Sequence, residues 1–303
     1  MARQPILARE PSAPSAMKAS LLARLLLVLC WSFSVAAAVP SAEHSFVFPY
    51  EHGPAIMVWV HVPSAHDADT PVIVVMHGVR RNGREYRDQW RALSEQFRFL
   101  LVVPEFSRAD FPGAERYNLG GVFDADGRRA PETRWTYSYL EPLFDVVRER
   151  YQLTAAHYGL YGHSAGAQFV HRFALYKPDA RAAVVVAANA GWYQMPDASE
   201  RYPYGLQLAG VDAAALPRFL ARRMVVLLGE ADTDSDHRSL RQTPAARAQG
   251  PDRLSRGRAF FAAGAAAACA GRVEFGWQLA LVPGVGHDNS KMAAHAIDFL
   301  LTR

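Results

Sequence analysis

The sequence predicts an α/β protein with a mostly parallel central sheet that is covered by helices on both faces. Short apolar, β-branched runs alternate with longer helix-like segments along most of the chain, which is the order expected of such a sheet. Runs such as residues 184–186 and 225–228 lack polar alternation, as strands buried on both sides do. Half of the 303 residues are hydrophobic and 20% are charged, so the chain can bury a sizeable core.

The individual elements follow from this alternation. Apolar residues at helical spacing predict helices through Trp90 and Leu93 and over residues 139–151, 165–176 and 292–301. The predicted strands are seven apolar runs at residues 56–62, 72–76, 99–103, 158–161, 182–187, 224–228 and 278–282. Residues 191–217 interrupt the alternation and are a candidate small cap over the site. No repeat or long linker divides residues 39–303, so we expect one domain.

Residues 1–38 are predicted to be a leader and a secretory signal peptide that are removed. Two cations precede an apolar run at residues 25–31, and three alanines end at Ala38, where we expect cleavage. The run is too short to span a bilayer, which needs roughly 20 apolar residues, so no stable membrane insertion is expected after cleavage. Translation starts at either Met1 or Met17. We expect the mature protein to be secreted or periplasmic.

Removal of this leader changes what charge and cysteine content imply. It takes away four cations and one anion, so the net charge of +4 falls to about +1. No basic block with interleaved aromatic residues remains, and we expect no nucleic-acid partner. Cys30 leaves with the signal peptide, so Cys269 is left alone and no intramolecular disulfide is expected. We expect Cys269 to be a buried, small apolar residue of an Ala-rich helix.

The segment Gly162-His163-Ser164-Ala165-Gly166 carries the strongest chemical signal. It follows a predicted strand and precedes a predicted helix, so the chain turns sharply at Ser164 and exposes its hydroxyl at the end of the sheet. The two glycines stand where larger side chains would collide. The Ala165 N–H at the helix start is a predicted oxyanion donor. Ser164 is therefore the predicted nucleophile.

A serine nucleophile of this kind is followed along the chain by its acid and then by its histidine base. Of the downstream histidines, His287 comes directly after an apolar strand, whereas His171 and His295 lie within helices. His237, in a polar loop, is a distant second candidate. We therefore predict that His287 is the base.

The acid is expected at the end of the preceding strand, where Glu230, Asp232 and Asp234 lie close together. Asp232 stands three residues beyond Gly229, the usual offset, and is the favoured acid. Asp234 remains the alternative. The carboxylates that are not used for catalysis are expected to be solvated or to cap a following turn.

The second oxyanion donor is expected in the loop after an early strand, residues 77–83. The Val79 N–H is the predicted donor, and His77 is expected to stabilise the loop rather than to perform chemistry. Arg80 and Arg81 either meet an anionic group of the substrate or are solvated.

Together these stretches resemble the α/β-hydrolase superfamily over residues 45–302, and within it the secreted esterases that are similar to poly(3-hydroxybutyrate) depolymerases and feruloyl esterases. The matching stretches are His77-Gly78 with Asn82-Gly83 and Tyr86, the Ser164 turn, residues 229–234 and residues 284–287. The resemblance implies an α/β-hydrolase fold and ester hydrolysis through an acyl-enzyme, without a metal or an organic cofactor. No appended binding domain, Ser/Thr-rich linker or Cys pair is seen, which weighs against action on insoluble polymer.

The expected function is hydrolysis of carboxylic esters, with a small-molecule or oligomeric ester as substrate. A peptidase on the same fold and a catalytically silent binding protein are the alternatives. Four aromatic residues of the candidate cap either line an acyl or aromatic pocket or pack the cap onto the body. They are Trp192, Tyr193, Tyr202 and Tyr204.

Overall fold

An eight-stranded sheet forms the centre of the computed structural model, which describes residues 45–212 and 214–302. Its strands lie in the order β1 (Ser45–Tyr50), β2 (Gly53–His61), β4 (Leu100–Glu105), β3 (Val72–Met76), β5 (Tyr158–His163), β6 (Ala182–Ala188), β7 (Met224–Gly229) and β8 (Trp277–Val282). The β1–β2 and β2–β4 pairs are antiparallel. All the other pairs are parallel, which confirms the predicted fold class.

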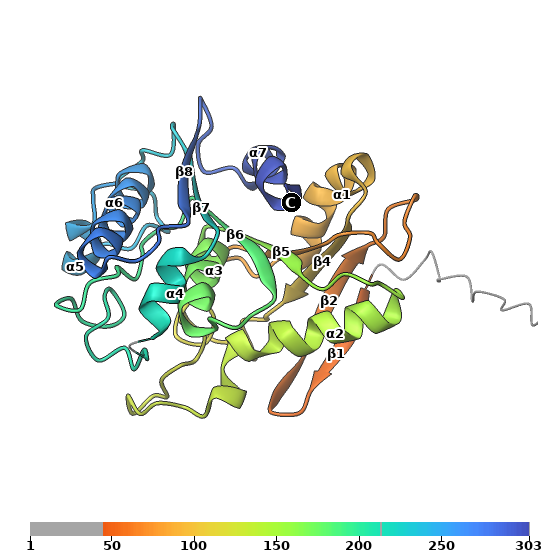
Figure 1. Cartoon of the computed structure of the whole chain (residues 1–303), viewed down its shortest axis with the longest axis horizontal. Helices are drawn as coiled ribbons and strands as arrows, with labels where there is room; N and C mark the ends of the chain where they lie inside the picture. The colour runs from red at the N-terminus through yellow and green to blue at the C-terminus, as the bar shows by residue number, and fades with distance from the viewer. Residues whose placement is uncertain (1–44, 213, 303) are drawn as a thin grey trace, which may run out of the picture. The chain divides into compact units, whose positions relative to one another are not determined.

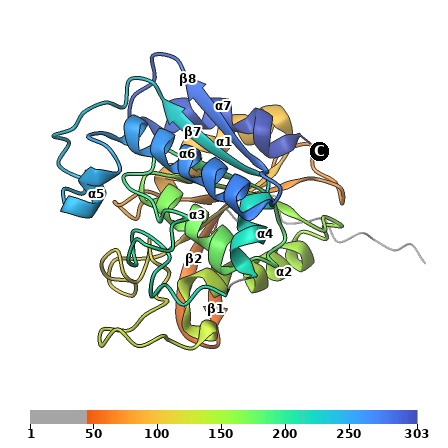
Figure 2. The ribbon, with the colours of Figure 1, turned by 60° about the vertical axis from the view of Figure 1, so that its left-hand side comes forward.

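Helices cover both faces of this sheet (Figure 1). On one face α1 (Gly83–Phe97) and α7 (Asn289–Leu301) contact each other and the strands. On the other face α3 (Ala165–Tyr176) packs on β5 and β6 and contacts α4 (Ala215–Ala221). Figure 2 shows α6 (Arg253–Gly271) lying along β7 and β8. The remaining elements are α2 (Leu140–Arg150), α5 (Pro244–Ala248) and two short 3₁₀ helices, Glu132–Arg134 and Thr136–Tyr139.

The core on the α1–α7 side shows why the apolar strands take this arrangement. Trp90 of α1 is fully buried, with its ring centroid 4.7 Å from that of Tyr161 on β5 and 6.3 Å from that of Phe99. All five residues of β3 are buried, because helices lie on both of its sides. Burial on both faces removes the polar alternation from these strands, as the sequence indicated.

Three local features differ from the sequence-based expectation. The structure adds β1, a six-residue strand whose exposed and buried residues alternate at the edge of the sheet. Pro104 lies within β4, beyond the predicted end of this strand. The strand tolerates it because the pairing with β3 ends at Val102, so β3 needs no hydrogen bond from residue 104. Cys269 is exposed, contrary to the expectation that it is buried. The buried face of α6 runs through residues such as Gly264 and Ala268, and Cys269 lies beside that face.

The carboxyl ends of the parallel strands β3, β5, β6, β7 and β8 meet at one edge of the sheet, where open α/β sheets bind their ligands. Within residues 45–212 and 214–302, no helix has the length and apolar character needed to cross a bilayer. The predicted leader, signal peptide and cleavage site lie outside the described residues.

Candidate active site

Ser164 stands at a strained backbone turn between β5 and α3. Its φ of 59° and ψ of −114° lie outside the regions that L-residues ordinarily adopt. A Cβ on Gly162 would collide with the backbone of Gly166, and a Cβ on Gly166 would collide with the carbonyl of Met76. Both glycines are therefore required for the turn. The turn places the Ser164 hydroxyl at the edge of the sheet, next to the start of α3.

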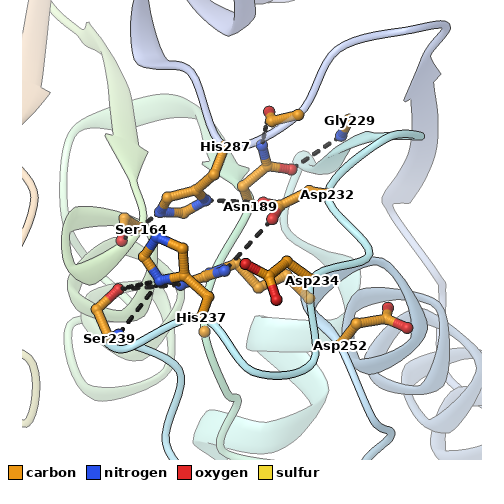
Figure 3. Close-up of polar contacts among 12 residues, drawn as sticks. Ser164, Asn189, Gly229, Asp232, Asp234, His237, Ser239, Asp252 and His287 are labelled. Atoms are coloured by element: carbon orange, nitrogen blue, oxygen red, sulfur yellow. Dashed lines mark hydrogen bonds and ion pairs between the residues drawn. The ribbon is translucent and has the colours of Figure 1, made fainter.

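The three residues predicted for catalysis lie in one hydrogen-bonded line (Figure 3). His287 Nε2 is 3.0 Å from Ser164 Oγ, and His287 Nδ1 is 2.7 Å from Asp232 Oδ2. Asp232 is 3% exposed, so its interactions are little screened by water. The line joins residues that are 123 and 55 positions apart in the chain. It is the geometry in which a base accepts a serine proton and an acid orients that base.

Asn189, which follows β6, forms hydrogen bonds with both of the loops that carry Asp232 and His287. Its Nδ2 donates to the Gly286 carbonyl (3.1 Å), and its Oδ1 accepts from the Gly229 N–H (2.8 Å). Figure 3 shows Asn189 between these two loops. Asn189 takes a φ of 50°, a conformation that Asn tolerates better than most residues. The loop that carries Asp232 and the loop that carries His287 are thus held to the same side chain.

The competing carboxylate and histidines have other places in the structure. Asp234 is exposed, and its Oδ1 accepts from the Asp236 N–H (3.0 Å), so it caps its own turn. His171 is buried within α3 and uses both ring nitrogens for backbone contacts, whereas His295 is exposed on α7. The Nδ1 atom of His237 accepts from Ser239 and from Arg253.

His163, the residue before Ser164, is buried beneath His287. Their ring centroids are 4.6 Å apart, and His163 Nδ1 lies 3.3 Å from the Tyr86 hydroxyl. Burial first, and then the nearness of His287 and Arg253, holds the pKa of His163 well below its ordinary value. His163 therefore supplies a neutral ring that supports His287 from below.

The loop after β3 is organised by His77, as predicted. Phe106 N–H donates to His77 Nε2 (3.0 Å), so the ring proton resides on Nδ1 and donates to the Gly78 carbonyl (3.2 Å). Burial lowers the pKa of His77 to about 3. Arg81 is buried too and donates to the carbonyls of Phe106 and Gly113 (2.8 Å each), so it supports the loop and is not presented to a substrate.

The two predicted oxyanion donors lie beside Ser164. Ala165 begins α3. Val79 follows Gly78, and a Cβ added to Gly78 would lie 3.8 Å from the Ser164 Cβ. Among the described residues, no hydrogen bond uses the N–H of Val79 or of Ala165. Both groups are thus free to donate to a negatively charged oxygen at the Ser164 hydroxyl.

A solvent-open cleft of about 590 Å³ surrounds Ser164 and His287. Its charged lining includes Arg80, Arg108 and Arg238, all exposed, and the carboxylates of Glu85 and Asp288. The carboxylates are engaged at helix starts: Glu85 accepts from Asn82, and Asp288 accepts from the N–H groups of Ser290 and Lys291. Among the described residues, Arg80 and Arg238 form no ion pair with protein carboxylates. Three arginines and two carboxylates therefore line the cleft, which gives a small excess of positive charge near Ser164.

Of the four aromatic residues considered for a pocket, Trp192 and Tyr193 are buried, and Tyr202 and Tyr204 are half-buried. Trp192 is 3% exposed and lies under the guanidinium of Arg172, 4.2 Å from the ring centroid. Tyr193 is fully buried and stacks on Phe260, with 4.4 Å between centroids. Tyr202 and Tyr204 pack against the cluster of Leu119, Trp192 and Ala246. None of residues 191–217 is among the residues that line the cleft, so this segment takes the packing role of the two alternatives.

Sequence reasoning did not identify three residues that support the line: Asn189, His163 and Arg253. Arg253 is 1% exposed, and its Nη1 lies 3.3 Å from Asp232 Oδ1. The sequence offered a signal only for His163, which belongs to the motif around Ser164. Asn189 and Arg253 reach the site from distant segments, and nothing in their local sequence marks them.

Comparison with known proteins places this chain in a family. No protein-family model and no curated protein matches the sequence. Among solved structures, poly(aspartic acid) hydrolase-1 from Sphingomonas sp. KT-1 is 41% identical, with a TM-score of 0.83 over 85% of this chain and 98% of that one. The poly(3-hydroxybutyrate) depolymerase LpqC from Bordetella parapertussis is 38% identical, with a TM-score of 0.78 over 82% and 87%. An S-formylglutathione hydrolase from Agrobacterium tumefaciens, at 18% identity and a TM-score of 0.55, shares the fold.

The fold and the strand–serine–helix turn define an α/β-hydrolase. The chain belongs to the esterase- and depolymerase-like family of this superfamily, together with the two bacterial polymer hydrolases. It is a hydrolase of the serine type.

The neutral state of His77 predicts part of the acid sensitivity of the fold. Between its unfolded pKa of about 6.5 and its folded pKa of about 3, only the unfolded state binds the proton, so stability falls as pH falls through this window. His77→Gln keeps an acceptor but does not titrate. Between pH 7 and pH 4.5, we expect the unfolding free energy of the variant to fall by about 2 to 3 kcal/mol less than that of the wild type. Urea unfolding at both pH values checks this, and equal losses would contradict it.

Proposed function

We propose that the protein hydrolyses carboxylic esters through an acyl-enzyme, with Ser164 as nucleophile, His287 as general base and Asp232 as the acid that orients His287. The observation that carries the proposal is the unbroken line from Asp232 Oδ2 through His287 to Ser164 Oγ, with distances of 2.7 and 3.0 Å. The chain order of the three residues is also that of α/β-hydrolases.

In the first step His287 Nε2 removes the Ser164 proton as Oγ attacks the ester carbonyl. Asp232 stabilises the imidazolium that forms, and the N–H groups of Val79 and Ala165 donate to the tetrahedral oxyanion. Each such donor lowers the barrier by roughly 3 kcal/mol. His287 then protonates the leaving alkoxide, which departs as the alcohol. Water, deprotonated by His287, attacks the acyl-enzyme in the second step and releases the acid.

The choice of acid is tested by a matched pair of substitutions in one loop. We expect Asp232→Asn to lower kcat on p-nitrophenyl acetate by about 10⁴-fold, because His287 loses its orienting partner. Asp234→Asn, on an exposed carboxylate outside the line, is expected to change kcat less than twofold. Fluorophosphonate labelling of the wild type, absent in Ser164→Ala, reports whether the serine is reactive. Loss of turnover only in Asp234→Asn would refute the assignment, and an unlabelled wild type would support a silent binding protein.

The cleft arginines favour a second candidate, hydrolysis of amide bonds in a polyanionic chain. One relative is described as a poly(aspartic acid) hydrolase, and poly(aspartic acid) carries a carboxylate on every unit. Arg80, Arg108 and Arg238 are placed to meet such carboxylates near Ser164, because each lines the cleft. A neutral polyester has no anionic group that could pair with them.

Paired substitutions separate the two candidates. For a polyanionic substrate we expect Arg80→Ala/Arg238→Ala to raise KM for poly(aspartic acid) about tenfold, because two attractive charges are lost, and rising salt is expected to have the same direction of effect. The control, Arg91→Ala/Arg258→Ala, removes two exposed arginines outside the cleft lining and is expected to leave that KM within twofold. If the protein hydrolyses neutral p-nitrophenyl esters but does not cleave poly(aspartic acid), the second candidate is excluded and only the ester function stands.

We also propose that the protein is exported and that the mature chain begins after Ala38. The charged start, the short apolar run and the three alanines before that position support this proposal. Expression of the full chain in a bacterial host is expected to yield a periplasmic or secreted product whose first residue, by N-terminal sequencing, is Val39. An uncleaved product in the cytoplasm would contradict it.

A further inference from the structure

We propose that Arg253 is a positioning residue for the reaction, which fixes the Asp232 carboxylate for His287 and joins it to the wall of the cleft. This inference rests on the proposed roles of Ser164, His287 and Asp232.

The contacts of Asp232 divide its two carboxylate oxygens between two partners. Oδ2 accepts from His287 Nδ1 at 2.7 Å, and Oδ1 accepts from Arg253 Nη1 at 3.3 Å. The Asp232 backbone carbonyl also accepts from the Leu254 N–H (3.3 Å), so both ends of the residue are anchored to the start of α6. A carboxylate held at both oxygens has little freedom to rotate away from His287.

The second arm of the Arg253 guanidinium reaches the cleft wall. Nη2 donates to Ser239 Oγ at 3.0 Å and to His237 Nδ1 at 3.1 Å, and both of these residues line the cleft. Burial, with the nearby charge of Arg253 and of His287, lowers the pKa of His237, which suits its acceptor role. One buried cation therefore connects the acid to a turn that faces the substrate.

Burial makes this contact electrostatically significant. Arg253 is 1% exposed and Asp232 is 3% exposed. Among the described residues, Asp232 is the one carboxylate that forms an ion pair with Arg253. The other charged and titratable groups around His287 and this pair are His163, His237, Tyr193, Asp234, Arg256 and Asp288. The pKa values of the two neighbouring histidines, His163 and His237, are lowered, so both rings are neutral and Arg253 is the cation that contacts the Asp232 carboxylate.

Arg253→Met keeps much of the side-chain length and removes the charge and the donors. Two consequences act in the same direction: a repelling cation is lost, and the full charge of Asp232 becomes available to the imidazolium. We expect the acidic limb of the kcat/KM profile on p-nitrophenyl acetate to move up by roughly half a pH unit to one pH unit. At the pH optimum kcat is expected to fall about tenfold with a smaller change in KM, and Arg253→Lys is expected to restore much of the profile.

Arg256→Met is the matched control, because Arg256 lies three residues further along α6 and is also fully buried. Its guanidinium donates to the carbonyls of Gly250, Gly191 and Arg241, and to no residue of the catalytic line. We expect this variant to lose thermal stability, as Arg253→Met does, without moving the acidic limb. An equal shift in both variants, or none in Arg253→Met, would overturn the proposal.

A double variant distinguishes positioning through Asp232 from general damage. If Arg253 acts through the acid, Arg253→Met is expected to change kcat less than twofold in an Asp232→Asn background, because the group that it positions is already disabled. A further tenfold loss in that background would overturn the proposal. If Arg253→Met does not fold, Arg253→Lys and Arg253→Gln are compared in the same way. Failure of the proposed function is seen separately, as a wild type without ester turnover or Ser164 labelling.

Discussion

The backbone turn at Ser164 is the constraint on which the site depends. A non-glycine residue with positive φ persists only where its surroundings hold it there, and here β5, α3 and the β3 loop all do so. The same geometry that excludes a side chain at Gly162 and Gly166 brings the Met76 carbonyl against α3. The loop after β3, which carries Gly78 and Val79, thereby lies beside Ser164. The positions of Ser164 and of the loop that carries the second proposed oxyanion donor are thus consequences of one packing arrangement.

Charge at the site is arranged around this turn with a clear asymmetry. Three histidines near the catalytic line, His77, His163 and His237, have lowered pKa values because they are buried or lie near cations. Two of these neutral rings, those of His163 and His237, pack against the ring of His287. Asp232 forms an ion pair with Arg253 and also contacts His287. His287 therefore differs from its histidine neighbours in its contact with a buried carboxylate.

The sequence predicted those parts of the structure that depend on local residue patterns. The strand–turn–helix context identified Ser164, and the position of His287 and Asp232 after predicted strands brought them to the same sheet edge. Arg253 and Asn189 were not predicted, because their roles arise from contacts between segments about 20 to 100 residues apart. The aromatic residues near Trp192 illustrate the opposite case. Their composition left a pocket and packing of the cap as alternatives, because composition does not determine which way a side chain points.

The packing of those aromatic residues affects how a substrate is recognised. With Trp192 and Tyr193 buried, the cleft beside Ser164 is lined largely by polar side chains and is open to solvent. An enclosed apolar pocket selects an acyl chain by burying it, whereas an open cleft with free arginines selects by charge along the substrate. The second mode suits a chain that extends beyond the scissile bond, because contacts on either side of Ser164 add to binding without enclosing the reacting carbonyl. Length and charge of the substrate are therefore expected to determine specificity more than the size of its acyl group.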